Sequence, residues 1–211
     1  AKKTTSPKAL LSRSRRILLL GLLGLAPEPS VALAGAEPSA RALESAWTWW
    51  SGSEETGQPG TYGTRGLESA TNVPGARLGS ATWIDGSGNL WLFGGYGLAE
   101  TDEGTLNDLW RFSRASKRWT WVGGARTAND PGVYCIGGDF CGTELWPGAR
   151  RDAFAWTDGS GGLWLYGGAF AGDQRWSDLW RYSTATSTWT LVSGTSAKNE
   201  AASYGTRGVP S

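Results

Sequence analysis

Two stretches of this chain, residues 77–122 and 150–192, have nearly the same sequence. The matching positions are Trp83 with Trp156, Trp91 with Trp164 and Gly94-Gly95 with Gly167-Gly168 at an offset of 73, and Asp108-Leu109-Trp110-Arg111 with Asp178-Leu179-Trp180-Arg181 and Trp119 with Trp189 at an offset of 70. A repeat of this length indicates one supersecondary unit built at least twice. The unit, and not any single residue, therefore decides what the chain can fold into.

The amino-acid composition narrows the fold class and the chemistry. The 211 residues include 32 Gly and 14 Trp, but no Met and no His. Glycine and aromatic residues at fixed spacing are typical of a turn-rich, all-β repeat protein. The absence of His excludes a His general base, a Ser-His or Cys-His nucleophile pair, and any His-ligated metal site within this sequence.

The first 34 residues have the three parts of an export signal. Six Lys and Arg residues precede the apolar run 17–26, and Ala32-Leu33-Ala34 provides a small-residue cleavage site. Ten apolar residues are too few to cross a bilayer, which requires about 20. We expect residues 1–34 to be a signal peptide and 35–45 a linker, in a protein that is secreted, periplasmic or in an organelle lumen. A buried or interfacial amphipathic helix is the alternative.

Without residues 1–34 the chain has 14 Lys and Arg against 18 Asp and Glu, a net charge of −4. Nucleic acid requires a clustered basic surface, so we expect no nucleic-acid partner. We also expect no membrane association once the signal is removed.

Cys135 and Cys141 enclose a five-residue spacer. In an exported protein this spacing favours a small disulfide loop. Two free or buried thiols are the alternative, and a metal pair would need ligands that the sequence lacks. We expect no metal ion and no cofactor.

Each repeat divides into four short runs with the period-two alternation of a β-strand. The runs are 81–84, 90–93, 109–112 and 119–122 in the first repeat, and 154–157, 163–166, 179–182 and 189–192 in the second. Asp and Gly residues between the first two runs of each repeat predict a tight hairpin turn. No helical period appears after residue 45, so the sequence predicts an all-β domain.

Residues 72–192 resemble the kelch family of β-propellers, which includes the propeller domain of galactose oxidase. The residues that carry the resemblance are Gly94-Gly95 and Gly167-Gly168 at the end of the second strand, Trp110 and Trp180 on the third strand, and Trp119 and Trp189 opening the fourth. The family usually has Tyr near the third-strand position. The resemblance implies a kelch-like β-propeller fragment with two complete four-stranded antiparallel blades, at about 72–122 and 144–192, plus partial flanking blades, within a segment spanning 46–211.

The period of 70 to 73 residues exceeds the roughly 50 residues of a kelch unit. The surplus lies in inter-blade insertions at 51–73, 123–146 and 193–211, in which Tyr62, Tyr134 and Tyr204 recur. Trp47 to Trp50 are interpreted as the fourth strand of a preceding blade. Two blades cannot close a ring of 4–8, so we expect the partners to include the remaining blades of a longer chain or a self-association partner.

Residues that recur in both repeats are interpreted as scaffold. This applies to the matched tryptophans, which we expect between blades. It also applies to Asp108 and Asp178, which we expect to accept backbone N–H bonds in a turn or to form cross-strand ion pairs. Arg77 and Arg150 are expected to bond loop carbonyls or a carboxylate of the adjacent blade. Asp85 to Asn89 fit a hairpin turn better than a calcium loop, because the distal Glu is missing. For the tryptophans outside the repeat, core or rim packing is the favoured interpretation and an exposed surface is the alternative: Trp49, Trp50, Trp121, Trp146 and Trp176.

The loops that differ between the repeats are where partner recognition is expected on a shared scaffold. The candidate partner-binding residues are Glu100, Asp102, Glu103, Asp173, Arg175 and Trp176. We expect a non-catalytic module that binds a protein or ligand, the partner being an unknown protein or a glycan. The alternatives are a fragment of a galactose oxidase-like carbohydrate oxidase, whose copper-ligating His has no counterpart in this sequence, and a glycan-binding propeller.

Overall fold

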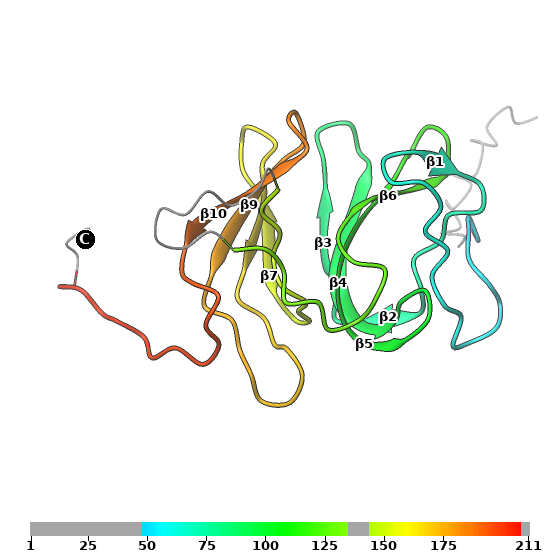
Figure 1. Cartoon of the computed structure of the whole chain (residues 1–211). Helices are drawn as coiled ribbons and strands as arrows, with labels where there is room; N and C mark the ends of the chain where they lie inside the picture. The colour runs from blue at the N-terminus through cyan, green and yellow to red at the C-terminus, as the bar shows by residue number, and fades with distance from the viewer. Residues whose placement is uncertain (1–47, 135–143, 208–211) are drawn as a thin grey trace, which may run out of the picture. The chain divides into compact units, whose positions relative to one another are not determined.

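The computed structural model describes residues 48–134 and 144–207, and all regular structure in these two ranges is β (Figure 1). None of the described residues forms a helix able to cross a bilayer. The predicted all-β, antiparallel class is therefore confirmed. The predicted signal peptide, the linker and the pair Cys135 and Cys141 lie outside the described residues.

The first sheet is an antiparallel meander of four main strands with two short additions. The main strands are β3 (Ala81–Ile84), β4 (Leu90–Leu98), β5 (Glu103–Phe112) and β6 (Trp119–Gly123). β1 (Glu68–Ser69) pairs with the outer edge of β6, and β2 (Arg77–Leu78) pairs with the far end of β4. Both additions come from the first predicted insertion and its junction with the repeat.

The second sheet repeats the same meander without the additions. Its strands are β7 (Phe154–Thr157), β8 (Leu163–Tyr166), β9 (Leu179–Ser183) and β10 (Thr188–Ser193), in the order β10-β9-β8-β7. All eight strands predicted from the sequence are present, because their alternating side chains distinguish two faces of each sheet.

The turn between the first two strands of each repeat is closed by an aspartate. Asp85 Oδ1 accepts hydrogen bonds from the backbone N–H groups of Ser87 and Asn89 at 2.9 and 3.0 Å. Asp158 does the same for Ser160 and Gly162. The hairpin interpretation thus accounts for these carboxylates, which bond the chain's own donors.

The paired glycines adopt the same left-handed conformation in both repeats, but only one pair ends a strand. Gly94 and Gly95 have φ of 63° and 101°, and Gly167 and Gly168 have 64° and 99°. β8 ends before its pair, as predicted. β4 instead continues through its pair to Leu98 with a register shift, because its extension is paired by β2 on one side and by a longer β5 on the other.

Residues 48–50 do not form the predicted fourth strand of a preceding blade. Among the described residues, the first strand begins at Glu68. Trp49 and Trp50 are exposed, and the Lys117 ammonium lies 4.2 Å from the ring centroid of Trp50.

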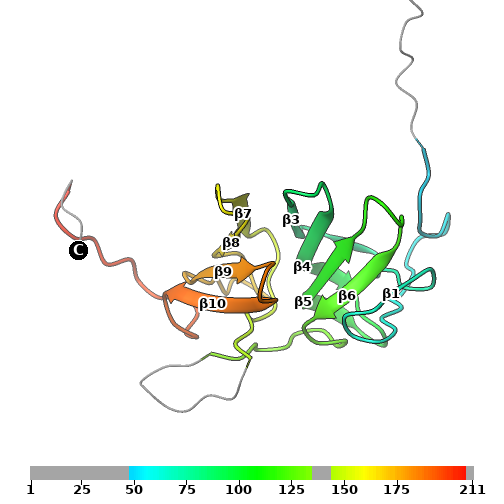
Figure 2. The same ribbon diagram turned by 90° about the horizontal axis from the view of Figure 1, so that it is seen from above.

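The two sheets pack face to face, and their shared interface is the hydrophobic core (Figure 2). Trp91 contacts Tyr182 and Phe93 contacts Trp189, each with ring centroids 5.5 Å apart. The indole N–H of Trp83 donates to the carbonyl of Trp164 across the interface at 2.9 Å. Aromatic side chains therefore fill the space between the sheets, and one of them also satisfies a backbone acceptor.

Candidate functional site

Each repeat contains a buried arginine that is bonded to a buried aspartate. In the first repeat Arg77 donates from both terminal nitrogens to Asp108, at 2.6 and 2.8 Å, in a bidentate ion pair. Its remaining donors bond the carbonyls of Gly75 and Gly94 at 3.0 and 3.1 Å. The planar guanidinium thus ties the segment before β2 to the Gly-Gly bulge and to β5.

Two aromatic donors complete this network. Asp108 Oδ2 accepts the hydroxyl of Tyr62 and the indole N–H of Trp110, both at 2.7 Å. Tyr62, Asp108 and Trp110 are fully buried. Each carboxylate oxygen therefore has at least one strong donor, which is the condition for keeping a charge in the protein interior.

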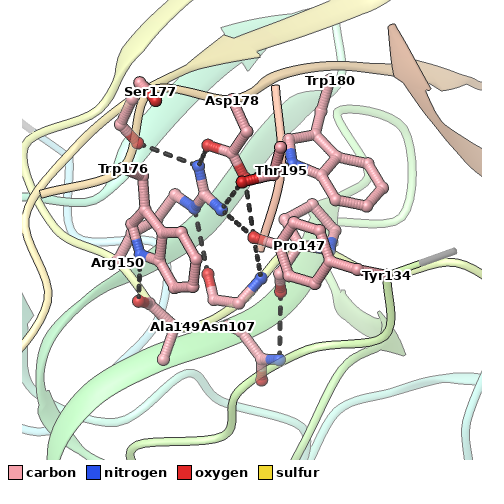
Figure 3. Close-up of polar contacts among 12 residues, drawn as sticks. Asn107, Tyr134, Pro147, Ala149, Arg150, Trp176, Ser177, Asp178, Trp180 and Thr195 are labelled. Atoms are coloured by element: carbon pink, nitrogen blue, oxygen red, sulfur yellow. Dashed lines mark hydrogen bonds and ion pairs between the residues drawn. The ribbon is translucent and has the colours of Figure 1, made fainter. Parts of the chain in front are cut away.

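The second repeat contains the same network (Figure 3). Arg150 bonds Asp178 at 2.6 and 2.8 Å, while Tyr134 and Trp180 donate to Asp178 at 2.6 and 2.7 Å. The ring of Trp176 covers the guanidinium, with its centroid 4.9 Å from Cζ of Arg150. In the first repeat Leu106 occupies the position equivalent to Trp176.

The charges in these networks are fixed by their surroundings. Burial on its own would raise the pKa of Asp178, but the hydrogen bonds and charge of Arg150 outweigh it and hold that pKa below its usual value. Burial raises the pKa of Tyr134 and of Tyr62. The carboxylate of Asp178 stays ionised and both phenols stay protonated near neutral pH, so the arrangement serves as a rigid polar tie between chain segments.

The sequence predicted part of this arrangement. For Arg77 and Arg150 the prediction is a bond to loop carbonyls or to a carboxylate of the adjacent blade. Both do bond carbonyls, but the carboxylate that each one binds is the aspartate of its own repeat. Tyr62 and Tyr134 were not recognised as members. Their recurrence in the insertions, 72 residues apart, was the signal that could have identified them.

Arg150 also links the two sheets. Its backbone N–H donates to the carbonyl of Leu106, and its carbonyl accepts from Gly95 N–H, both at 2.9 Å. Since the side chain of Arg150 bonds Asp178 of the second sheet, one residue holds the first sheet through its backbone and the second through its guanidinium.

The candidate partner-binding residues of the first loop contact their own repeat. Glu100 forms an ion pair with Arg126 at 3.4 Å, and Asp102 accepts the backbone N–H of Ala128 at 3.0 Å. Glu103 is exposed at the start of β5, opposite Leu98. All three are exposed, so their outer surfaces remain accessible to a partner.

The second loop separates into exposed and buried members. Asp173 and Arg175 are exposed, and the backbone N–H of Arg175 donates to Asn199 Oδ1 at 2.9 Å. Trp176, the third candidate of this loop, is only 5 % exposed. It packs over Arg150 and donates to the carbonyl of Ala149 at 3.1 Å, so it belongs to the buried network and not to a recognition surface.

The other tryptophans outside the repeat also differ from one another. Trp146 is buried against Trp189, and Trp121 is half-buried with its indole N–H on the carbonyl of Gly123. Trp146 and Trp176 therefore fit the favoured interpretation of core or rim packing, whereas Trp49 and Trp50 are exposed. Within the described ranges no three acidic or Cys side chains gather in a way that could hold a metal ion.

The residues on the outer face of the second sheet occupy the same repeat positions as the residues on the inner face of the first sheet, which are buried. Strand register places Ala81, Trp83, Trp91 and Phe93 on the first sheet's inner face. Their equivalents are Phe154, Trp156, Trp164 and Tyr166. Trp83 is 4 % exposed whereas Trp156 is 45 % exposed, and Ala81 at 4 % corresponds to Phe154 at 71 %. We call this outer surface the open face.

The residues on the outer face of the first sheet occupy the same repeat positions as the residues on the inner face of the second sheet. Leu163 of the second sheet is fully buried against the first, whereas its equivalent, Leu90, is 46 % exposed. We call this the trailing face. The two outer faces therefore carry the same kinds of residue as the two faces that already pack together in the core.

No protein-family model matches the chain, and no curated protein sequence matches it significantly.

Proposed function

We propose that this chain is a non-catalytic, kelch-like interaction module that acts outside the cytoplasm, and that its outer sheet faces bind further four-stranded units of the same kind. One observation carries the proposal: the open face and the trailing face repeat the residues that pack against each other in the core. The signal-like pattern of residues 1–34 supports an exported module.

The open face has the chemistry of a docking surface. Phe154, Trp156 and Tyr166 lie together on one side of β7 and β8, exposed to solvent. Covering an aromatic side chain of this size contributes about 1.5–3 kcal/mol, and contiguous exposed apolar patches mark interaction sites in soluble proteins. A covering sheet would present an apolar strip such as Leu163, Leu165 and Tyr182 present to the first sheet.

The repeat geometry supports the kelch-like assignment. Both repeats are four-stranded meanders. Each has a Gly-Gly pair at positive φ directly after the first four residues of its second strand, and a Trp within the first two residues of its fourth strand. Sheets of this kind stack through their faces in a propeller. On such a scaffold the exposed loop residues Glu100, Asp102 and Arg175 are available for a further protein or ligand.

Because the two faces differ, copies of this chain would associate head to tail, open face on trailing face. Sedimentation velocity of the full chain over a concentration series tests this. Phe154→Asp blocks the open face and Leu90→Asp blocks the trailing face, so each variant alone is expected to be monomeric. An equimolar mixture is expected to form a 1:1 dimer, because each variant keeps the face that the other has lost.

Val133→Asp places the same charge on an exposed apolar residue outside both faces and serves as the control. It is expected to associate like the unchanged chain. A monomer at all concentrations, or an effect of Val133→Asp equal to that of the two face variants, contradicts the proposal.

Glycan binding is a second candidate, favoured by one observation. Trp156 and Trp164 stack at 5.8 Å with an interplanar angle of 8°, and Trp156 is accessible on the open face. Sugar rings bind to exposed indole faces through their apolar C–H surfaces. Tryptophan fluorescence titration with a panel of glycans tests it: a saturable change that Trp156→Ala removes supports the candidate, and a flat response across the panel rejects it.

A further inference from the structure

A polar pocket of about 490 Å³ opens between the two sheets, at the end where their hairpin turns lie. One wall is a row of neighbouring side chains across β4, β5 and β6: Trp91, Arg111 and Thr120. The opposite wall comes from the second sheet and includes Tyr182 and Ser187. The volume lies within the range of small-molecule sites. We call this cavity the Arg111 pocket.

Arg111 differs from its equivalent in the second repeat. Arg181 donates from Nε to Asp158 at 3.0 Å and from Nη2 to Ser160 at 2.9 Å. Arg111 Nε is buried and has no hydrogen-bond partner among the described residues. Its Cζ lies 6.0 Å from the Trp91 ring, which supports the guanidinium without satisfying its donors.

A single residue difference explains why Arg111 is unpaired. The position of Asn89 in the first turn is occupied by Gly162 in the second. A Cβ at Gly162 would lie 2.5 Å from Nε of Arg181, so the arginine reaches its aspartate only because this residue is glycine. In the first repeat the Asn89 amide takes that place and donates to Asp85 Oδ2 at 3.0 Å.

Asp85 accepts four hydrogen bonds from other groups and does not form an ion pair with Arg111, so the positive charge of Arg111 is not neutralised by it. It accepts from the Trp91 indole at 2.8 Å, from the Asn89 amide, and from two backbone N–H groups of the turn. Burial would raise the pKa of Asp85, but these hydrogen bonds outweigh it and hold the pKa below its usual value. The carboxylate is ionised, and its hydrogen-bond donors come from the turn and from Trp91.

A second unsatisfied group lies beside Arg111. Thr120, its cross-strand neighbour, is 2 % exposed, and its hydroxyl has no partner among the described residues. The nearby Arg65 is already engaged with Glu144 at 2.8 Å. A buried donor without a partner costs about 1–3 kcal/mol, more when it is charged, so the pair Arg111 and Thr120 favours an occupant that supplies acceptors.

We propose that the Arg111 pocket binds a small monoanionic carboxylate that also carries hydroxyl groups, such as a hydroxy acid or an acidic sugar. The carboxylate accepts from the guanidinium of Arg111 and from the hydroxyl of Thr120. The hydroxyls of Ser87, Thr184 and Ser187 on the two turns bond the ligand's own hydroxyls. One unpaired guanidinium matches one negative charge. The inference does not rest on the proposed function, because both walls belong to sheets that are already packed together.

The test is isothermal titration calorimetry of the full chain with glucuronate, with glucose as the neutral control of the same ring. Binding of glucuronate and at least tenfold weaker binding of glucose are expected. In ¹⁵N-edited NMR spectra the Nε–H signal of Arg111, assigned by its absence in Arg111→Gln, is expected to shift on titration with glucuronate.

Asn89→Gly is the decisive variant, because it gives the first turn the sequence feature of the second and lets Arg111 pair with Asp85. It keeps every charge. We expect it to weaken glucuronate binding about tenfold or more, because the N–H donors of Arg111 would then be bonded to Asp85. Arg181→Gln removes an arginine that is already paired and is the matched control, with unchanged affinity expected.

Either of two binding results would overturn the proposal. The first is no heat and no Nε–H shift with glucuronate at millimolar concentration, which would mean that the pocket holds water only. The second is equal binding of glucose and glucuronate. Unchanged affinity in Asn89→Gly would also overturn it. Thermal unfolding of each variant shows whether the fold is intact, so that a loss of binding is not confused with unfolding.

Discussion

Arg150 and Asp178 form a bidentate ion pair in which both side chains are fully buried, with N–O distances of 2.6 and 2.8 Å. The same arginine bonds the first sheet through both of its backbone groups. The pair is therefore a connection between two sheets as well as a local contact.

Asp178→Ala should lower the free energy of unfolding by about 3–5 kcal/mol, because it leaves the Arg150 charge buried without a partner. Urea denaturation of the full chain measures the change. Asp173→Ala alters a fully exposed carboxylate and should change stability by less than about 0.5 kcal/mol. Similar effects of the two substitutions would show that the buried pair does not hold the sheets together.

Stability should fall as the solution is made acidic. The pKa of Asp178 is lower in the folded protein than its unfolded value of about 3.9, so its contribution is fully present above that value and is lost as pH falls through the folded pKa. Asp85 shifts in the same direction. Unfolding free energies from pH 7 down to pH 2 should decline mainly below about pH 4, and Asp178→Asn should flatten that decline.

Gly94→Ala should destabilise the protein far more than Gly172→Ala. Both glycines have similar positive φ, 63° and 65°, so each alanine carries the same backbone strain of about 1–2 kcal/mol. A Cβ at Gly94 would in addition lie 2.5 Å from the carbonyl of Arg150, whereas nothing lies within 4 Å at Gly172. The difference in melting temperature between the two variants measures the cost of the close contact between Gly94 and Arg150. Equal melting temperatures would contradict the prediction.

Equivalent tryptophans should respond differently to the same substitution. Trp83→Ala removes a ring buried between the sheets and a hydrogen bond to Trp164, with an expected cost of about 3–5 kcal/mol. Trp156→Ala alters the open face and should cost less than about 1 kcal/mol in the monomer. Chemical denaturation at low protein concentration measures both, and a large cost at Trp156 in the monomer would mean that this side chain is not on an open surface.

The strands were predictable because alternation of side chains is a local property. All eight repeat strands overlap the predicted runs, and all except β4 and β5 match the predicted bounds within one residue. The aspartate-closed turns follow from Asp and Gly at fixed positions. The extension of β4 to Leu98 was not predictable, because it depends on pairing with β2 and with the start of β5. Neither of these segments belongs to a run that the sequence predicts as a strand.

The site was less accessible to sequence reasoning than the fold. Recurrence indicated that Asp108 and Arg77 were scaffold, but recurrence alone does not show which arginine meets which carboxylate. Trp176 has no tryptophan counterpart in the first repeat, which makes it a candidate for partner binding, yet its ring covers Arg150. The unpaired state of Arg111 depends on the difference between Asn89 and Gly162. The effect of this difference follows from the distance between a Cβ at Gly162 and the Arg181 side chain, which the sequence does not give.

The position of Arg150 has a consequence for how the molecule comes apart. A residue anchored by its amide and carbonyl to one sheet and by its guanidinium to the other cannot release either sheet alone without exposing buried charge. Amide protons on both sheets should therefore exchange with solvent in a single cooperative opening.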